Sequence, residues 1–185
     1  GVPPEKRNKE NNLLEYFESN EIQISGLIIA DYCENHSHWN SNRTLSDWME
    51  KNNVPGLYGI DTRKLTKIIR TKGTMNAKII FDKNEEIFKL SSKNLVREVS
   101  RKGITEFNED GKYKLIIIDC GIKNNIIRKF LQYKDLYLKI VPFDYKIEED
   151  YDGIFVSNGP GDPKDCVETI NTLKNLIKND KPIFG

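Results

Sequence analysis

Neither sign of charge is in excess in this sequence, which has 29 Lys and Arg, 28 Asp and Glu, and a formal net charge of +1. Proteins that bind nucleic acids through the phosphate backbone carry a basic patch or stripe, and this balance gives no sign of one. We therefore expect no nucleic-acid partner. The hydrophobic share of 37% and the charged share of 31% fit a soluble globular chain that can bury a sizeable core.

Long hydrophobic runs are also missing. No apolar stretch approaches the roughly 18 residues that a membrane-spanning helix needs, and no charged and then apolar leader opens the chain. The first residue is Gly1 rather than Met, which suggests a chain cut out of a longer protein. We expect no membrane association and a cytoplasmic location.

Cysteine and histidine are scarce. Cys33, Cys120 and Cys166 are odd in number and widely spaced, so neither a disulfide framework nor a zinc site is expected, and we interpret them as reduced thiols. His36 and His38 lie in one polar loop, but no third ligand of suitable spacing is nearby. Because metal sites normally need about three or four donors, we expect no metal in this chain.

The first half of the chain contains two helices by pattern. A helix capped by Thr44 or Ser46 is predicted to end at Lys51, and a second is predicted to begin at 61–62 and to end at Gly73. The other expected elements are strands over 22–30 and 77–81, a loose helix over 85–90 and a short apolar patch at 95–96.

The second half alternates strands with helices. Continuous apolar runs predict buried strands, because they leave no solvent face, and the segments between them have the helical spacing of apolar residues. Such alternation predicts right-handed crossovers and a parallel, doubly wound sheet of the α/β class. The expected strands cover 113–119, 136–141, 153–156 and 182–185, and the expected helices begin at 124–125 and at 163.

A domain boundary is predicted between residues 105 and 112, where the sequence is rich in turn formers. We therefore divide the chain into a mixed α/β domain, residues 1–108, and the first part of a doubly wound domain, residues 112–185. The second domain is expected to be incomplete at its end, because no helix follows the strand residues Ile183 and Phe184.

The stretch from Gly153 to Pro163 is the best candidate for a binding site. Its strand breaks at Ser157 into a turn with Gly159 and Gly161, which can take positive φ and let another molecule approach the bare backbone. Ligands of α/β proteins bind outside the carboxyl ends of the strands. The sequence therefore predicts a ligand site in this loop.

Several longer motifs follow one another along the chain. They are VPGLYGIDTRKLTKIIR at 54–70, KGTM at 72–75, IDCGIKNNIIR at 118–128, IVP at 140–142 and SNGPGDP at 157–163. Together they resemble the glutaminase, or small-chain, region of carbamoyl-phosphate synthetase, in which an amino-terminal small-chain domain precedes a class I glutamine amidotransferase domain. The likeness covers essentially the whole chain. Three further stretches resemble the eukaryotic fused form of the pyrimidine pathway most closely, GVPP at 1–4, YFES at 16–19 and SHW at 37–39.

The resemblance implies a reaction and two binding residues. Glutamine would be hydrolysed by a cysteine nucleophile that a histidine activates, and the ammonia would pass to a synthetase for carbamoyl phosphate synthesis. Gly159 would give a backbone N–H to the oxyanion, and Gly161 would contact the bound glutamine. The implied partners are glutamine and a synthetase large chain or fused synthetase domains. ATP and Mg are expected only in the synthetase part, so we expect no cofactor in this region.

The catalytic residues themselves are not expected in this chain. The resemblance places the nucleophile about two residues beyond Gly185 and the histidine–glutamate pair further on. Cys120 is not expected to replace the nucleophile, because the family also carries cysteine or an aromatic residue there. Cys166 falls inside a predicted helix and is no replacement either. We therefore predict that this chain alone hydrolyses no glutamine.

Three alternatives stay open. One branch of the family uses free ammonia because serine replaces the nucleophile; its loop tends to have GGPGNP, so Asn158 and Asp162 favour the branch that uses glutamine. A role as a small subunit of the arginine pathway also stays open, because only the degree of resemblance to each form favours the pyrimidine pathway. A flavodoxin-like binding module would also alternate strands with helices, but DCGIK at 119–123 supplies neither a phosphate-binding loop nor clustered carboxylates.

Overall fold

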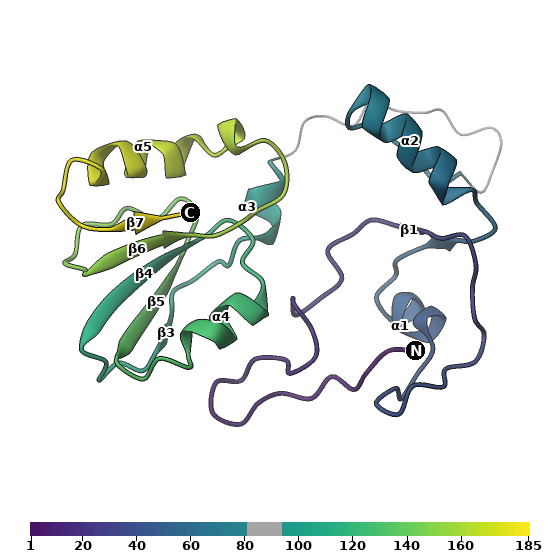
Figure 1. The fold of residues 1–185 in the computed structure, drawn as a ribbon, viewed down its shortest axis with the longest axis horizontal. Helices are drawn as coiled ribbons and strands as arrows, with labels where there is room; N and C mark the ends of the chain where they lie inside the picture. Colours follow the sequence, from purple (N-terminus) through teal and green to yellow (C-terminus); the bar gives the residue numbers. More distant parts are fainter. Residues whose placement is uncertain (81–93) are drawn as a thin grey trace. The chain divides into compact units, whose positions relative to one another are not determined.

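The computed structural model describes residues 1–80 and 94–185 of the chain (Figure 1). These residues form two compact units, the first made of residues 1–8 and 14–80 and the second of residues 9–13 and 94–185. Within these ranges every helix is too short or too polar to cross a bilayer. The helix predicted over 85–90 lies outside the described residues.

Both predicted helices of the first unit are confirmed. Helix α1 (Leu45–Lys51) begins with a capping box, in which the Thr44 hydroxyl accepts the N–H of Asp47 and the Asp47 carboxylate accepts the N–H of Thr44, each at 3.1 Å. This exchange satisfies two of the N–H groups that a helix start leaves without partners. Helix α2 (Thr62–Lys72) is capped by the Asp61 carboxylate and ends at the predicted glycine.

The strands of the first unit are shorter than predicted. Strand β1 (Leu27–Ile28) pairs in parallel with β2 (Gly56–Leu57), so only two residues of the predicted strand over 22–30 are in a ladder. The partner strand is two residues long, and past it the segments share only single hydrogen bonds, such as that from the Gly59 N–H to the carbonyl of Ala30 at 2.8 Å. The described part of the other predicted strand, residues 77–80, is in none of the strand ladders of the described residues. Its last residue is outside the described ranges.

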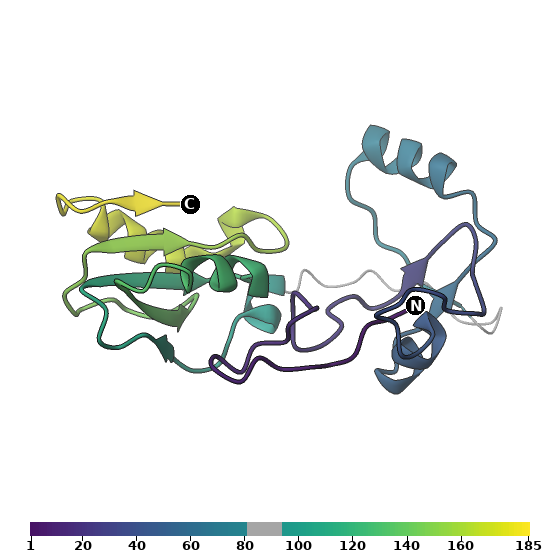
Figure 2. The same ribbon diagram turned by 60° about the horizontal axis from the view of Figure 1, so that its bottom comes forward.

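A five-stranded sheet is the centre of the second unit. Its order is β3-β5-β4-β6-β7, with β3 antiparallel to β5 and the other neighbours parallel; Figure 2 shows β7 at the upper edge. The parallel sheet that the alternating pattern predicts is therefore confirmed. The strands are β3 (Thr105–Phe107), β4 (Tyr113–Asp119), β5 (Leu136–Pro142), β6 (Gly153–Val156) and β7 (Ile183–Phe184).

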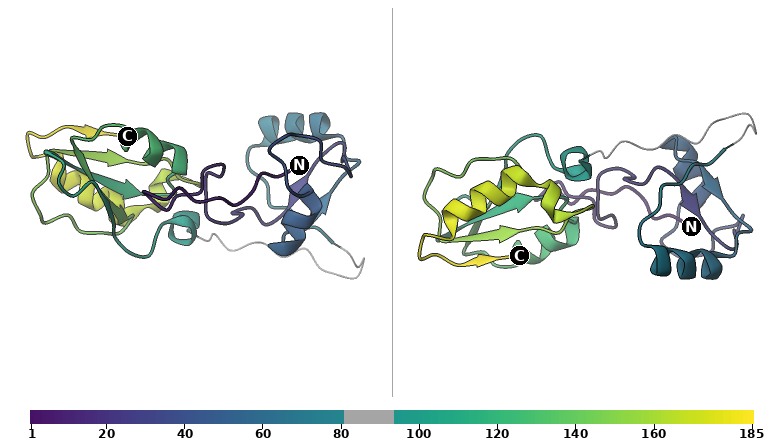
Figure 3. Two further views of the ribbon diagram at one scale, coloured as in Figure 1. Left: turned by 90° about the horizontal axis from the view of Figure 1, so that it is seen from below. Right: turned by 90° about the horizontal axis from the view of Figure 1, so that it is seen from above.

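Helices cover both faces of this sheet (Figures 1 and 3). Buried residues of α5 (Val167–Leu176) and of α3 (Leu95–Val99) pack on one face, and α4 (Asn124–Phe130) packs on the other. Strand β4 lies between them, and its residues Ile116 to Ile118 are at most 1% exposed. Burying one such side chain fully contributes about 1.5–3 kcal/mol, so this run accounts for much of the core.

Helix α5 begins later than predicted. The chain makes a 3₁₀ turn at Pro163–Asp165, and the α-helix starts only at Val167. The Asp162 carboxylate caps the turn by accepting the N–H of Lys164 at 2.9 Å. Cys166 then takes a non-helical conformation, φ −90° and ψ 57°, which separates the turn from the helix.

The second unit begins earlier than the sequence division suggests. The bounds 1–108 and 112–185 stay predictions for two sequence domains, but residues 94–107 pack with the second unit. The reason is that β3 pairs with β5 along its whole length, and Val96 of α3 is 3% exposed within the core under α5.

Candidate functional site

The predicted site lies at the carboxyl edge of the parallel sheet. Strands β4 and β6 are neighbours, with Ile118 opposite Val156, so the segments that follow them leave the sheet side by side. These are the turn 119–123 and the loop 157–163. Because this edge is where α/β sheets bind ligands, the structure brings the predicted loop to the expected place.

Ser157 joins the two segments. Its N–H donates to the carbonyl of Ile118 at 3.0 Å, and its hydroxyl accepts the N–H of Cys120 at 2.9 Å while donating to the carbonyl of Asn158 at 2.9 Å. The residue is 7% exposed. One of these bonds reaches the turn, one reaches strand β4 and one stays within the loop, so the first loop residue is fixed against the end of β4 and its turn.

Gly159 lies directly against the carbonyl of Cys120. A Cβ atom added at Gly159 would be 2.2 Å from that oxygen, closer than real Cβ atoms come to any neighbour. The loop therefore needs glycine here for its own packing, whether or not a ligand is bound. The sequence pattern pointed only to space for a ligand, because this contact joins residues far apart in the chain.

Gly161 has a different requirement. Its φ is +84°, a conformation that residues with a side chain rarely adopt. The space around it is open, since an added Cβ would have only Leu95 Cδ1 within 4 Å among the described residues, at 3.9 Å. The positive φ predicted for this glycine is confirmed, and its face is accessible to a small molecule.

Two N–H groups of the loop have no partner within the described chain. The backbone N–H of Gly159 and that of Gly161 donate no hydrogen bond to any residue in 1–80 or 94–185. Free, rigidly held N–H donors are what an oxyanion or a carboxamide oxygen requires. N–H groups without a protein partner can donate to the oxygen of an amide or of its tetrahedral intermediate.

Asp119 fixes the turn after β4 and was not predicted as a site residue. One of its carboxylate oxygens accepts the N–H groups of Gly121 and Ile122, each at 2.8 Å. The other accepts the side chain of Arg101, with Nε at 2.8 Å. Asp119 is 3% exposed. A polar residue at the end of a buried strand was the available signal, but nothing in the sequence points to Arg101 as its partner.

The thiols of the second unit are unsuited to act as nucleophiles. Burial raises the pKa of the Cys120 thiol to about 11, and burial also raises the pKa of Cys166. Both residues are 7% exposed and lie in the core. Because the thiolate is the nucleophile, burial and a raised pKa both disfavour nucleophilic attack by these two thiols. The third cysteine, Cys33, is exposed and belongs to the first unit.

The histidines lie in the first unit, within the loop that the sequence indicated. His38 Nδ1 accepts the N–H of Asn40 at 3.2 Å, and the imidazole lies against the ring of Trp39, which is 86% exposed. In the part of the chain that the structure describes, no group of three or more His, Cys, Asp or Glu side chains could hold a metal ion.

Comparison with protein families covers most of both units. The model of the carbamoyl-phosphate synthase small chain, CPSase domain, matches residues 8–79, and the model of class-I glutamine amidotransferase matches residues 116–185. The two domains stand in the order that the motifs suggested. Residues 8–79 belong to the carbamoyl-phosphate synthase small-chain, CPSase domain, family, and residues 116–185 belong to the class-I glutamine amidotransferase family.

Curated relatives align along the whole chain. "Multifunctional protein pyr1-3" of Dictyostelium discoideum is 41% identical over 207 aligned residues, and the match covers 100% of this chain and 9% of that protein. The human "Carbamoyl-phosphate synthase [ammonia], mitochondrial" is 38% identical, covering 100% of this chain and 12% of that protein. The "Carbamoyl phosphate synthase arginine-specific small chain" of Neurospora crassa is 36% identical, covering 100% and 43%. The chain thus spans less than half the length of each of these relatives.

Proposed function

We propose that this chain is the first part of the glutaminase region of a carbamoyl-phosphate synthase that uses glutamine as its nitrogen source. The observation that carries the proposal is the loop 157–163, which holds two free N–H donors at the carboxyl edge of an amidotransferase sheet. The function of the whole protein, its substrates and its synthetase partner are parts of the same proposal.

In this proposal Gly159 and Gly161 divide the work of binding glutamine. The N–H of Gly159 stabilises the oxyanion that forms when a nucleophile attacks the carboxamide carbon, and Gly161 contacts the substrate through its open face. Removing one such donor in other enzymes lowers kcat by about 10²–10³-fold. The chain's own buried thiols take no part, because burial keeps them protonated.

The proposal is tested in the full-length protein, with release of glutamate from L-glutamine as the readout. Gly161→Ala should lower kcat/KM for glutamine by at least tenfold, because it adds strain and fills the open face. Carbamoyl phosphate formation from ammonium ions bypasses this step and should change less than twofold. An unaltered rate of glutamine hydrolysis in Gly161→Ala would contradict the proposed role.

The isolated chain of residues 1–185 gives a second test. We propose that it releases no glutamate or ammonia from glutamine, since Cys120 and Cys166 are buried and His36 and His38 belong to the other compact unit. Release of ammonia above the uncatalysed rate by the purified chain would overturn this part of the proposal.

The ammonia-dependent branch is the second candidate, favoured by 38% identity to the human enzyme whose name specifies ammonia. Asn158 and Asp162 support the glutamine branch instead. Full-length protein that forms carbamoyl phosphate from ammonium ions but not from glutamine would decide for the ammonia branch. The pyrimidine pathway is proposed over the arginine pathway from the likeness to the pyr1-3 protein. The cytoplasmic location stays a prediction from the sequence.

The first unit is proposed to dock on the synthetase. Deleting it while the complete amidotransferase domain is kept should leave glutamine hydrolysis in place and abolish its coupling to carbamoyl phosphate formation. Unchanged glutamine-dependent carbamoyl phosphate formation after the deletion would refute the docking role.

A further inference from the structure

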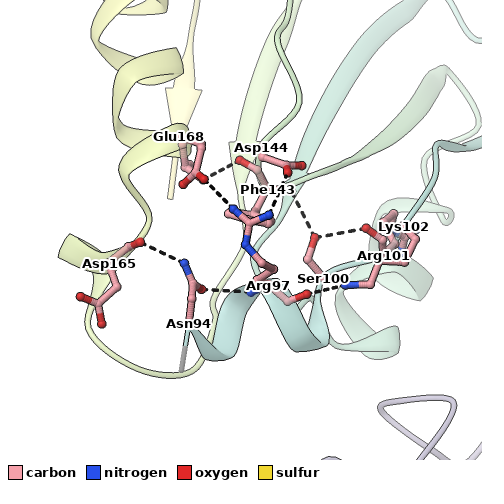
Figure 4. A network of polar contacts seen from close by, with 10 residues as sticks. Asn94, Arg97, Ser100, Arg101, Lys102, Phe143, Asp144, Asp165 and Glu168 are labelled. Carbon is pink, nitrogen blue, oxygen red and sulfur yellow. Dashed lines mark hydrogen bonds and ion pairs between the residues drawn. The ribbon is translucent and has the colours of Figure 1, made fainter. Parts of the chain in front are cut away.

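Residues 94–101 contact the ends of several strands at the edge that carries the site (Figure 4). The Asn94 side chain donates to the carbonyl of Asp165, beyond β6, at 3.1 Å. The Ser100 hydroxyl accepts the N–H of Phe143, just after β5, at 3.1 Å. Ser100 is 3% exposed, so this contact lies inside the unit. The segment therefore contacts the chain just after β5 and in the 3₁₀ turn beyond β6, the two strands that flank β4.

The next residue, Arg101, reaches the end of a third strand, β4. Its backbone N–H and its Nε both donate to one carboxylate oxygen of Asp119, at 3.2 and 2.8 Å. The side chains of Arg101 and Asp119 are 21% and 5% exposed. Because the pair is largely removed from water, its hydrogen bonds fix the geometry more firmly than a surface pair would.

The second carboxylate oxygen of Asp119 hydrogen-bonds to the turn 119–123, and this turn contacts the loop 157–163. It holds the N–H groups of Gly121 and Ile122, and the carbonyl of Gly121 accepts the Asn158 side chain at 3.5 Å. The turn also presents the Cys120 carbonyl, against which Gly159 packs. The order of contact is thus Arg101 to Asp119, Asp119 to the turn, and the turn to the loop.

We propose that Asp119, held in place by Arg101, is a positioning residue for glutamine hydrolysis. Its role is to hold the turn 120–122 in the position at which the Gly159 N–H points toward the oxyanion. This inference rests on the proposed function of the loop. This support matters because catalysis depends on hydrogen-bond donors that are already in position when the reaction begins. A displacement of about 1 Å can lower the rate roughly a hundredfold.

If the Arg101–Asp119 pair only stabilised the fold, its loss would have different effects. Strand β4 is paired along its length with β5 and over residues 115–118 with β6, and Arg101 belongs to neither ladder. Loss of the Arg101 side chain should therefore loosen the turn and leave the strand in place. A loosened turn beside an intact strand would distinguish a local positioning role from a general loss of stability.

The experiment uses the full-length protein and the variants Arg101→Ala, Arg101→Lys and Asp119→Asn. KM for L-glutamine, kcat with glutamine and kcat with ammonium ions are measured for each variant. Hydrogen exchange is followed at the amides of residues 120–122 and, for comparison, of 115–118. The control variant is Lys181→Ala, which removes an ion pair to Asp150 of 2.5 Å in the same unit but at the amino ends of β6 and β7.

We expect Arg101→Ala and Asp119→Asn to lower kcat/KM for glutamine at least tenfold and to change kcat with ammonium ions less than twofold. Amides 120–122 should exchange at least tenfold faster, while amides 115–118 and the Lys181→Ala control stay within twofold of wild type. Arg101→Lys keeps the positive charge that Arg101→Ala removes, and it should recover part of the loss.

Unchanged glutamine kinetics in both Arg101→Ala and Asp119→Asn would overturn the inference. So would an equal loss with ammonium ions, or faster exchange that extends through 115–118, because either result would show general destabilisation. Wild-type protein that hydrolyses no glutamine would instead refute the proposed function, and the inference would fall with it.

Discussion

The carbonyl oxygen of Cys120 lies so close to Gly159 that a Cβ atom at that position would be 2.2 Å from it. The contact joins the turn after β4 to the loop after β6, two segments that are neighbours only through the sheet. It gives Gly159 a packing requirement of its own, separate from any substrate. Substitutions of the two loop glycines should therefore have different effects on stability.

Gly159→Ala should destabilise the second unit by about 2–3 kcal/mol, because the backbone must shift to relieve an overlap with backbone atoms. Gly161→Ala should cost about 1–2 kcal/mol, since its φ of +84° is unfavourable for alanine but its surroundings are open. Gly103→Ala is the control, since an added Cβ there would have no atom of the described residues within 4 Å apart from its chain neighbours. Urea unfolding measures all three, and a smaller loss for Gly159→Ala than for Gly161→Ala would contradict the packing argument.

The cysteines should differ in reactivity. In folded protein at neutral pH, iodoacetamide should modify Cys33, which is exposed, and should leave Cys120 and Cys166 unmodified, because they are buried and their thiols are kept protonated by raised pKa values. In denaturant all three should react. Mass spectrometry of the labelled peptides identifies the sites, and rapid native labelling of Cys120 would show that the turn opens.

Alkaline pH should weaken the second unit partly through Cys120. Burial raises the pKa of this thiol from 9.0 to about 11, so the folded state holds the proton more tightly than the unfolded chain does. The resulting stability is fully present below pH 9 and is lost as the pH rises through about 11. Its size is on the order of 2 kcal/mol. Cys120→Ala should flatten this part of the profile of unfolding free energy against pH; an unchanged slope between pH 9 and 11 would disprove the assignment.

Acid should weaken the unit through Glu149. Burial alone would raise the pKa of this carboxyl, but hydrogen bonds and charge from Lys139 and Lys114 outweigh it and hold the pKa below its ordinary value of 4.5. The stabilisation is therefore present above about pH 4.5 and is lost as the pH falls through the lowered value. Glu149→Gln should destabilise the protein at pH 7 and have a much smaller effect at pH 3. An equal effect at both pH values would show that the charge of Glu149 is not responsible.

Local patterns were sufficient to predict much of the second unit. The strands over 113–119 and 153–156 have the predicted bounds, because continuous apolar runs such as Ile116 to Ile118 can only be buried on both sides. The glycine-bearing loop was predicted from the same change of pattern at Ser157. In the first unit, cap residues such as Thr44 marked the helices, since capping depends on neighbours three positions apart.

The rest depends on contacts between distant residues. Strand β3 is three residues long and only half-buried, and its pairing with β5 spans about thirty positions, so no local pattern announces it. The Arg101–Asp119 pair spans 18 positions, and its arginine lies in a stretch of ordinary surface charge. The packing of Gly159 on Cys120 likewise follows from strand order, which the sequence does not state residue by residue.

Strand β3 also bears on how this domain can be moved between proteins. Excision at residue 112, where the turn-rich sequence invites a cut, would leave the outer edge of β5 unpaired and remove Val96 from the core. An exposed edge of this kind recruits other strands and promotes aggregation. A transplanted or separately expressed amidotransferase domain should therefore begin before residue 94. In a chimera joined at residue 112 the edge of β5 would be exposed, and it would pair with strands of other molecules in solution.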